Sequence, residues 1–173
     1  MKKVGLFYGP LGGSTEKVAK KVAVALGNEN VELIPVKEAK AADVEKYENI
    51  IFGVSTIGKE TWDADKSAND WDVFLTEVEK VDYSGKVVAM FGLGDQITYD
   101  LHFVDALGTV AGKLLPKGAN IIGRVETEGY DFRESLALID GKFIGLPVNE
   151  DFEPEMTDER VNNWVEKIKT EFK

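Results

Sequence analysis

Residues 9–15, here named the glycine turn, have the composition of a backbone cradle for an anion. They read Gly-Pro-Leu-Gly-Gly-Ser-Thr and lie between a short apolar run and a segment with helical spacing. Glycines let main-chain N–H groups converge on an anion, and a helix N-terminus adds partial positive charge. The glycine turn therefore predicts a site for the phosphate of a ligand, with hydroxyl donors from Ser14 and Thr15. The predicted contacts are Gly9, Pro10, Leu11, Gly12, Gly13, Ser14 and Thr15.

The glycine turn matches neither of two common nucleotide-binding patterns. It contains no lysine, so it lacks the Gly-Lys-Ser/Thr ending of the nucleotide-hydrolase loop, and its glycines do not have the Gly-x-Gly-x-x-Gly spacing of dinucleotide sites. A monophosphate suits the turn better. A tight strand-to-helix turn with a Ser or Thr cap and no ligand is the alternative interpretation.

Apolar and helical segments alternate along the chain, which predicts the elements that position the glycine turn. Short runs rich in Val, Ile and Phe predict five strands, at residues 4–8, 31–36, 50–54, 87–92 and 120–125. Helical spacing predicts five helices, at residues 15–26, 42–47, 70–78, 101–115 and 157–172. Strands without a polar face are typical of a parallel sheet covered on both sides, so we expect an α/β, doubly wound fold.

Two further loops are expected beside the glycine turn. In an open parallel sheet the ligand lies outside the carboxyl ends of the strands, so the loops after the third and fourth predicted strands should line the same site. We name residues 55–63 the second loop and residues 93–100 the third loop. Each carries an aromatic residue, Trp62 and Tyr99 respectively.

Composition limits the class of protein. The 173 residues suit one domain, and the absence of cysteine excludes disulfides, thiolate metal sites and thiol nucleophiles. The net charge of −10 disfavours nucleic acid and anionic membrane and favours partners with basic faces. We find neither a signal peptide nor a bilayer-spanning segment, so we expect a cytoplasmic protein.

Motifs along the whole chain resemble those of the long-chain flavodoxin family. The glycine turn with Tyr8 fits the family's phosphate loop, and Phe91-Gly92-Leu93-Gly94-Asp95-Gln96 followed by Tyr99 is similar to its second flavin loop. The most specific pieces are similar to the long-chain insertion and the last helix: Glu128-Gly129-Tyr130-Asp131-Phe132 with Glu134-Ser135, Phe143-Ile144-Gly145-Leu146, Glu150-Asp151 and Trp164-Val165.

The resemblance implies a five-stranded sheet of order 2-1-3-4-5, an insertion at about residues 126–148 after or within strand five, and one non-covalent FMN. Its phosphate would lie in the glycine turn and its ring between the other two loops, with Tyr99 stacked on one face. Asp95 would lie by the pyrimidine edge. The ring site implied is Ser55, Thr56, Ile57, Gly58, Trp62, Leu93, Gly94, Asp95 and Tyr99.

The sequence departs from the family pattern at three positions. Pro10 and Gly12 replace threonines that would give the phosphate hydroxyl contacts, and Ile57 stands where an indole usually covers the ring. Trp62 either replaces that indole or packs elsewhere. The lone histidine, His102, is either a capping or surface residue or a neighbour of the flavin.

The resemblance predicts a low-potential one-electron carrier rather than an enzyme. Carboxylates beside the ring would lower its potential; the candidates are Glu60, Asp63, Asp65 and Asp95. Expected partners of this monomer are redox proteins with basic docking faces, namely flavodoxin or ferredoxin reductases and iron–sulfur oxidoreductases. Two alternatives stay open: a flavodoxin-like binding or regulatory module with weakened or lost FMN binding, and an FMN-dependent reductase.

Overall fold

The computed structural model describes residues 1–57 and 69–173 of the chain. Eight strands are present in these ranges: β1 (Val4–Tyr8), β2 (Val31–Pro35), β3 (Asn49–Val54), β4 (Val87–Leu93), β5 (Asn120–Ile121), β6 (Leu138–Ile139), β7 (Lys142–Phe143) and β8 (Leu146–Val148). Five α-helices accompany them: α1 (Ser14–Leu26), α2 (Ala41–Glu45), α3 (Asp70–Val78), α4 (Asp105–Leu114) and α5 (Thr157–Lys169). Short 3₁₀ turns are η1 (Asn28–Asn30), η2 (Leu115–Lys117) and η3 (Pro154–Met156).

The sheet has the predicted order and is parallel throughout. Within the described ranges its strands run β2-β1-β3-β4-β5, and β8 also pairs with β4. Every residue of β1 and β3 is buried, as expected for strands that are covered on both faces. The α/β, doubly wound prediction is therefore confirmed.

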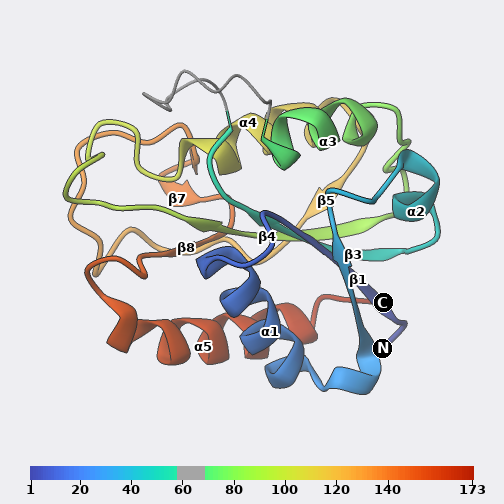
Figure 1. Cartoon of the computed structure of the whole chain (residues 1–173), viewed down its shortest axis with the longest axis horizontal. Helices are drawn as coiled ribbons and strands as arrows, with labels where there is room; N and C mark the ends of the chain where they lie inside the picture. The colour runs from blue at the N-terminus through green and yellow to red at the C-terminus, as the bar shows by residue number, and fades with distance from the viewer. Residues whose placement is uncertain (58–68) are drawn as a thin grey trace.

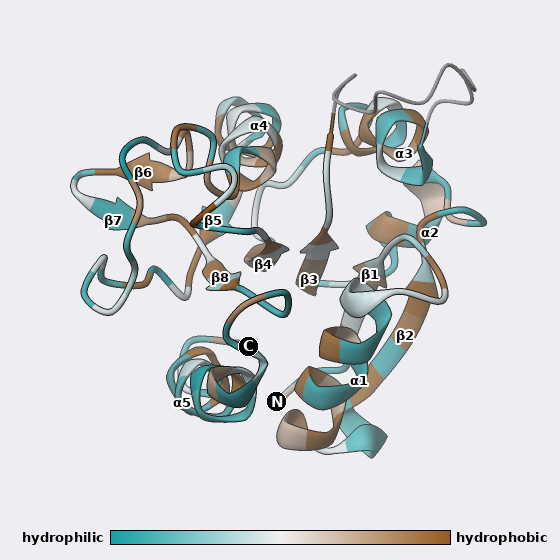
Figure 2. Ribbon diagram, turned by 60° about the vertical axis from the view of Figure 1, so that its left-hand side comes forward, coloured by the Kyte–Doolittle hydropathy of each residue, from teal (hydrophilic) through white to brown (hydrophobic). Residues whose placement is uncertain are grey.

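Helices cover the two faces of the sheet in separate layers. Figure 1 shows α1 and α5 together below the sheet and α3 and α4 above it, with the two chain ends close to one another. Each layer packs its own apolar cluster: Trp71, Phe74 and Leu107 belong to the upper cluster, and Val18 and Trp164 to the lower one. Figure 2 shows the apolar strands between these layers. No helix among the described residues is long and apolar enough to cross a bilayer.

The fifth strand of the prediction, residues 120–125, is wrong in extent because that strand is divided. β5 pairs with Val87 and Val88 at the start of β4, whereas β8 pairs with residues 91–93 at its end. Between them Gly123, with φ +77°, turns the chain away from the sheet, and residues 124–145 form an excursion that contains the β6–β7 hairpin. The insertion therefore lies within strand five.

The fourth helix begins later than the predicted residue 101. Val104, which precedes α4, has a left-handed backbone with φ +47°. The carbonyl of Asp100, at the start of the predicted helix, bonds to the excursion instead, where it accepts the N–H groups of Arg133 (2.8 Å) and Glu134 (2.9 Å). The excursion has thus taken over the backbone groups that a longer helix would use.

Candidate functional site

The glycine turn leaves the N-terminus of α1 without a side-chain cap. The N-cap position is Gly13, and the helix begins at Ser14. The first N–H groups of a helix have no partner inside the helix, so they are available to a ligand. A Cβ built at Gly12 or Gly13 would meet nothing within 4 Å, so the space above the turn is open. This uncapped backbone favours an anion site over the alternative interpretation, a Ser- or Thr-capped turn with no ligand.

The backbone angle at one glycine of the turn and the close packing at another explain why glycine stands at these two positions. Gly12 has φ +80°, a left-handed conformation that disfavours threonine, which explains why a glycine stands at this position. Gly9 lies against Val36, where a Cβ would come within 2.5 Å of Val36 Cγ2. The turn is therefore shaped by glycine backbones, and its remaining hydroxyls are those of exposed Ser14 and buried Thr15.

Sheet register brings the three loops to one edge. Tyr8 of β1 pairs with Gly53 of β3, and Gly53 pairs with Phe91 of β4. The glycine turn, the second loop and the third loop follow these residues by one or two positions. Parallel strands that end together place their loops side by side, as the sequence predicts.

A cavity of about 540 Å³ lies between the second and third loops. This volume lies within the usual range for ligand sites, roughly 300–1,000 Å³. Its lining comes from both loops, from the start of α4 and from the insertion: Ser55, Thr56, Ile57, Leu93, Gly94, Asp95, Tyr99, His102, Val104, Asp105, Ala106, Thr109 and Leu136.

Asp95 shapes the third loop with its carboxylate. Its Oδ1 accepts the N–H groups of Ile97 (2.8 Å) and Thr98 (3.0 Å). Burial acts to raise the pKa of Asp95, but hydrogen bonds from the side chain and backbone of Thr98 and from Ile97 outweigh it, so the pKa is lowered. Asp95 therefore stays ionised at neutral pH and places a fixed negative charge on the cavity wall.

The wall near α4 carries the chain's lone histidine. His102 Nδ1 lies 3.0 Å from Asp105 Oδ2, and Asp105 Oδ1 accepts the N–H of Leu136 at 2.8 Å. Tyr99, 53% exposed, lines the same cavity. His102 is exposed and contacts Asp105 at the start of α4 while it lines the cavity, so this geometry agrees with both interpretations of His102.

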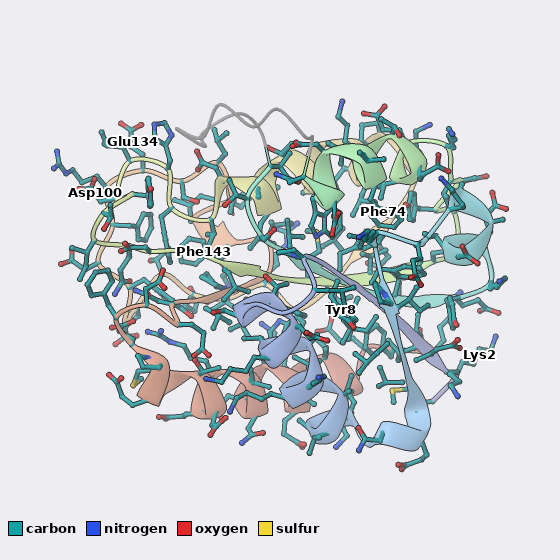
Figure 3. All side chains as sticks on the ribbon, viewed as in Figure 1. Lys2, Tyr8, Phe74, Asp100, Glu134 and Phe143 are labelled. Atoms are coloured by element: carbon teal, nitrogen blue, oxygen red, sulfur yellow. The ribbon has the colours of Figure 1, made fainter. Side chains whose placement is uncertain are left out.

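The insertion braces the third loop. Asp131 N donates to Gln96 Oε1 (3.1 Å), and Arg133 Nε donates to Asp100 Oδ2 (2.5 Å). Figure 3 shows Asp100 and Glu134, from these two segments, at the same end of the molecule. The third loop is thus held from outside by residues about thirty positions later in the chain.

A second cavity, of about 370 Å³, lies between the insertion and α5. Its cations are already engaged in the fold. Arg160 donates to Glu153 (2.8 Å) and to the carbonyl of Gly129 (3.2 Å), and its guanidinium carbon lies 4.3 Å from the Tyr130 ring centre. Lys167 donates to the carbonyl of Arg124. These contacts stabilise the packing of the insertion against α5, so we do not interpret this cavity as a ligand site.

The structure brings seven of the nine predicted ring-site residues into one cavity: Ser55, Thr56, Ile57, Leu93, Gly94, Asp95 and Tyr99. The residues of the glycine turn lie at the same sheet edge but do not line that cavity. Gly58 and Trp62, with Glu60, Asp63 and Asp65, fall outside the described residues. Sequence reasoning missed the parts played by Asp105, Leu136 and Glu16. Two of these residues had a signal in the sequence: Asp105 follows His102 at i, i+3, and Glu16 is the third helical residue after the N-cap Gly13.

A family model described as flavodoxin matches residues 6–164 of this chain. The chain belongs to the flavodoxin family. A flavodoxin from a Nostoc species is 42% identical over 171 residues, which cover 99% of this chain and 98% of the relative. Flavodoxin 1 of Azotobacter vinelandii is 40% identical over 176 residues, with 99% and 98% covered.

A solved flavodoxin from Fusobacterium nucleatum, bound to flavin mononucleotide, has the same fold. Its TM-score is 0.88 at 30% identity, with 100% of both chains covered. Membership of the flavodoxin family is therefore confirmed, as is the sheet order that the resemblance implied.

Proposed function

We propose that this flavodoxin-family chain binds one FMN non-covalently and carries single electrons between redox enzymes at low potential. The observation that carries the proposal is the convergence of three loops at one sheet edge. One loop presents an uncapped helix N-terminus, and the other two enclose a 540 Å³ cavity. The relative from Fusobacterium nucleatum, solved with flavin mononucleotide, has the same fold over its full length.

Each part of the site has a distinct task in this proposal. The glycine turn holds the phosphate with backbone N–H groups and with the hydroxyls of Ser14 and Thr15. Backbone groups around Gly58 and Gly94 bond the ring, and Tyr99 stacks on one face. Trp62 is the candidate for the other face, where Ile57 stands in the usual position of an indole. The bound flavin supplies the redox chemistry, and the chain orients it and limits its contact with water.

The charges around the cavity favour a low potential. Asp95 and Asp105 are both on its wall, and the chain as a whole carries a net charge of −10. Negative charges oppose the addition of an electron to a nearby group, so they lower its potential. His102 is the one histidine on the wall, and its contact with Asp105 pairs it with one of the two carboxylates.

The expected partners are redox proteins with basic docking faces, such as flavodoxin or ferredoxin reductases and iron–sulfur oxidoreductases. Exposed apolar side chains accompany the acidic groups near the site: Leu11, Ile97, Tyr99, Leu101 and Leu136. Acidic groups steer a basic partner, and a small apolar area permits contact without tight binding. We propose a cytoplasmic monomer.

We also assign the chain to the long-chain branch of the family, as one domain spanning residues 1–173. The divided strand five, with β5 and β8 on either side of the excursion, supports this assignment. Since the excursion bonds to the third loop through Asp100, its presence has a structural consequence at the site. No observation favours the binding-module or reductase alternatives over the carrier.

The absorbance spectrum of the purified chain tests the proposal. We expect a flavin spectrum with near-stoichiometric FMN, or full recovery of that spectrum when FMN is added to flavin-free protein. Stepwise reduction under anaerobic conditions should then show one-electron steps. A colourless protein that takes up no added FMN would disprove the proposal.

A further inference from the structure

One N–H group of the glycine turn is already bonded to a carboxylate. Gly12 N donates to Glu16 Oε2 at 2.8 Å, across the first turn of α1. The hydrogen bond from the Gly12 backbone is the main cause that lowers the pKa of Glu16, and it outweighs the desolvation that acts to raise it. Glu16 is therefore a charged acceptor at neutral pH.

The same carboxylate has two other neighbours. Tyr8, buried at the end of β1, is close enough to feel its charge, and Lys20 Nζ lies 3.6 Å from Glu16 Oε1. Burial raises the pKa of Tyr8 first, and the negative charge of Glu16 raises it further. Figure 3 marks Tyr8 near the middle of the molecule, beside α1. The carboxylate thus lies where the strand, the turn and the helix meet.

Two positions of the glycine turn offer no free backbone N–H group to a phosphate. Pro10 has no N–H, and the N–H of Gly12 is bonded to Glu16. A phosphate oxygen that took over the Gly12 N–H would have to displace the carboxylate, because two anions at one donor repel each other. The remaining turn positions supply N–H groups, and only Ser14 and Thr15 supply hydroxyls.

We propose that Glu16 is an internal anion that occupies part of the phosphate site until the cofactor displaces it. The inference rests on the proposed function, since it concerns the phosphate end of the same FMN site. Glu16 then sets how strongly the chain prefers a phosphorylated flavin over riboflavin, which has the same ring but no phosphate. Removal of its charge should strengthen phosphate binding and leave ring binding unchanged.

Two variants of Glu16 separate this role from a structural one. Glu16→Gln keeps the size and an acceptor for Gly12 N but removes the charge, and Glu16→Ala removes both. If Glu16 only holds Gly12 in its left-handed conformation, the Ala variant loosens the turn and weakens FMN binding. If Glu16 occupies the site, both variants strengthen it. Glu45→Gln is the matched control, because Glu45 is exposed at the end of α2, before the start of β3.

The experiment measures the dissociation constants of FMN and riboflavin for the flavin-free full-length chain and these variants, by quenching of flavin fluorescence. We expect FMN to bind about tenfold more tightly to both Glu16 variants, as for one charge-assisted hydrogen bond released to the ligand. Riboflavin affinity should change less than about twofold, as should both affinities in Glu45→Gln. Weaker FMN binding by Glu16→Ala, or an equal gain for riboflavin, overturns the inference.

A second readout keeps the inference separate from the proposed function. Inorganic phosphate is titrated into the ¹⁵N-labelled chain without flavin, and the Gly12 amide signal is followed by NMR. The signal should move at lower phosphate concentration in Glu16→Ala than in the unchanged chain. A chain that binds neither flavin defeats the carrier proposal, whereas identical phosphate titrations in both proteins defeat the role of Glu16.

Discussion

The side chain of Asn49 holds the backbone of Lys173 with two hydrogen bonds. Asn49 Oδ1 accepts the Lys173 N–H at 3.0 Å, and Asn49 Nδ2 donates to the Lys173 carbonyl at 3.0 Å and to that of Lys2 at 3.0 Å. The side chain is fully buried at the start of β3. One amide therefore ties the segment after α5 and the segment before β1 to the central strand, at the edge of the sheet opposite the site.

Replacing Asn49 should destabilise the fold without changing the site. Asn49→Ala leaves the backbone groups of Lys2 and Lys173 with fewer partners, so we expect a loss of about 2–4 kcal/mol in the free energy of unfolding. Urea denaturation measures it. Asn162→Ala, on the exposed face of α5, is the control and should stay within about 0.5 kcal/mol. Equal stabilities for the two variants would contradict the role given to Asn49.

Two glycines of α4 should respond in opposite directions to alanine. A Cβ at Gly108 would lie 2.1 Å from the carbonyl oxygen of Leu136 in the insertion, whereas one at Gly112 would meet nothing within 4 Å. We expect Gly108→Ala to cost about 1–3 kcal/mol through overpacking and to loosen the insertion. Gly112→Ala should gain about 0.5–1 kcal/mol from helix propensity. Thermal unfolding of both variants measures the contrast, and similar shifts would disprove the close contact.

Much of the fold was predictable because the strands are buried on both faces. β1 and α3 have the predicted bounds, Val4–Tyr8 and Asp70–Val78. Strand five was not, because β5 and β8 each pair with a different half of β4 and are separated by more than twenty residues. Long-range pairing of that kind leaves no local pattern in the sequence, and the turn at Gly123 has no signal beyond the glycine itself.

Part of the candidate site was predictable from the sequence for a similar reason. Strand order places the second and third loops together, and the cavity lining of Ser55 and Gly94 agrees with that placement. The contacts made by Glu16 and Asp105 depend on rotamers and on the path of the insertion, which hydrophobic periodicity does not encode. Polar side chains are fixed by such local geometry, so their partners are harder to predict than the strands that carry them.

The ionised state of Asp95 should contribute to stability in a defined pH window. Its folded-state pKa is lowered, so the stabilisation is present above the unfolded-state value, about 3.9, and is lost as pH falls through the folded-state value. Asp95→Asn keeps one acceptor for Ile97 and Thr98 but no charge. We expect it to lower the free energy of unfolding by about 0.5–1.5 kcal/mol at pH 7.

That difference between Asp95→Asn and the unchanged chain should shrink toward zero as the pH falls through the folded-state pKa of Asp95, because the carboxyl is then protonated in both states. Urea denaturation at a series of pH values follows it. A difference that is the same at pH 7 and at the acid end would show that the charge of Asp95 is irrelevant to the third loop.

Tyr99 should contribute stacking energy to FMN binding, and the same assay tests Trp62. Tyr99 lines the cavity and is 53% exposed, so its ring is free to cover a ligand. We expect Tyr99→Ala to weaken FMN binding by about tenfold to a hundredfold, from the loss of about 1–3 kcal/mol of stacking, and Tyr99→Phe to retain most of the affinity. Fluorescence titration measures both. The same assay on Trp62→Ala decides whether Trp62 replaces the missing indole, since an unchanged affinity removes it from the site.

Electron exchange with a basic partner should slow as salt is added. The chain carries a net charge of −10, and the Debye length falls from about 30 Å at 0.01 M to about 8 Å at 0.15 M ionic strength. Stopped-flow exchange with a flavodoxin reductase should therefore lose about one order of magnitude in its second-order rate constant over that range.

Ile97→Ser removes one exposed apolar side chain, 62% accessible, beside the site. Because this change leaves the net charge intact, it should lower the rate at every ionic strength and keep the slope of rate against salt. A rate that is indifferent to salt would rule out electrostatic steering, and an Ile97→Ser variant with unchanged rates would place the docking surface elsewhere.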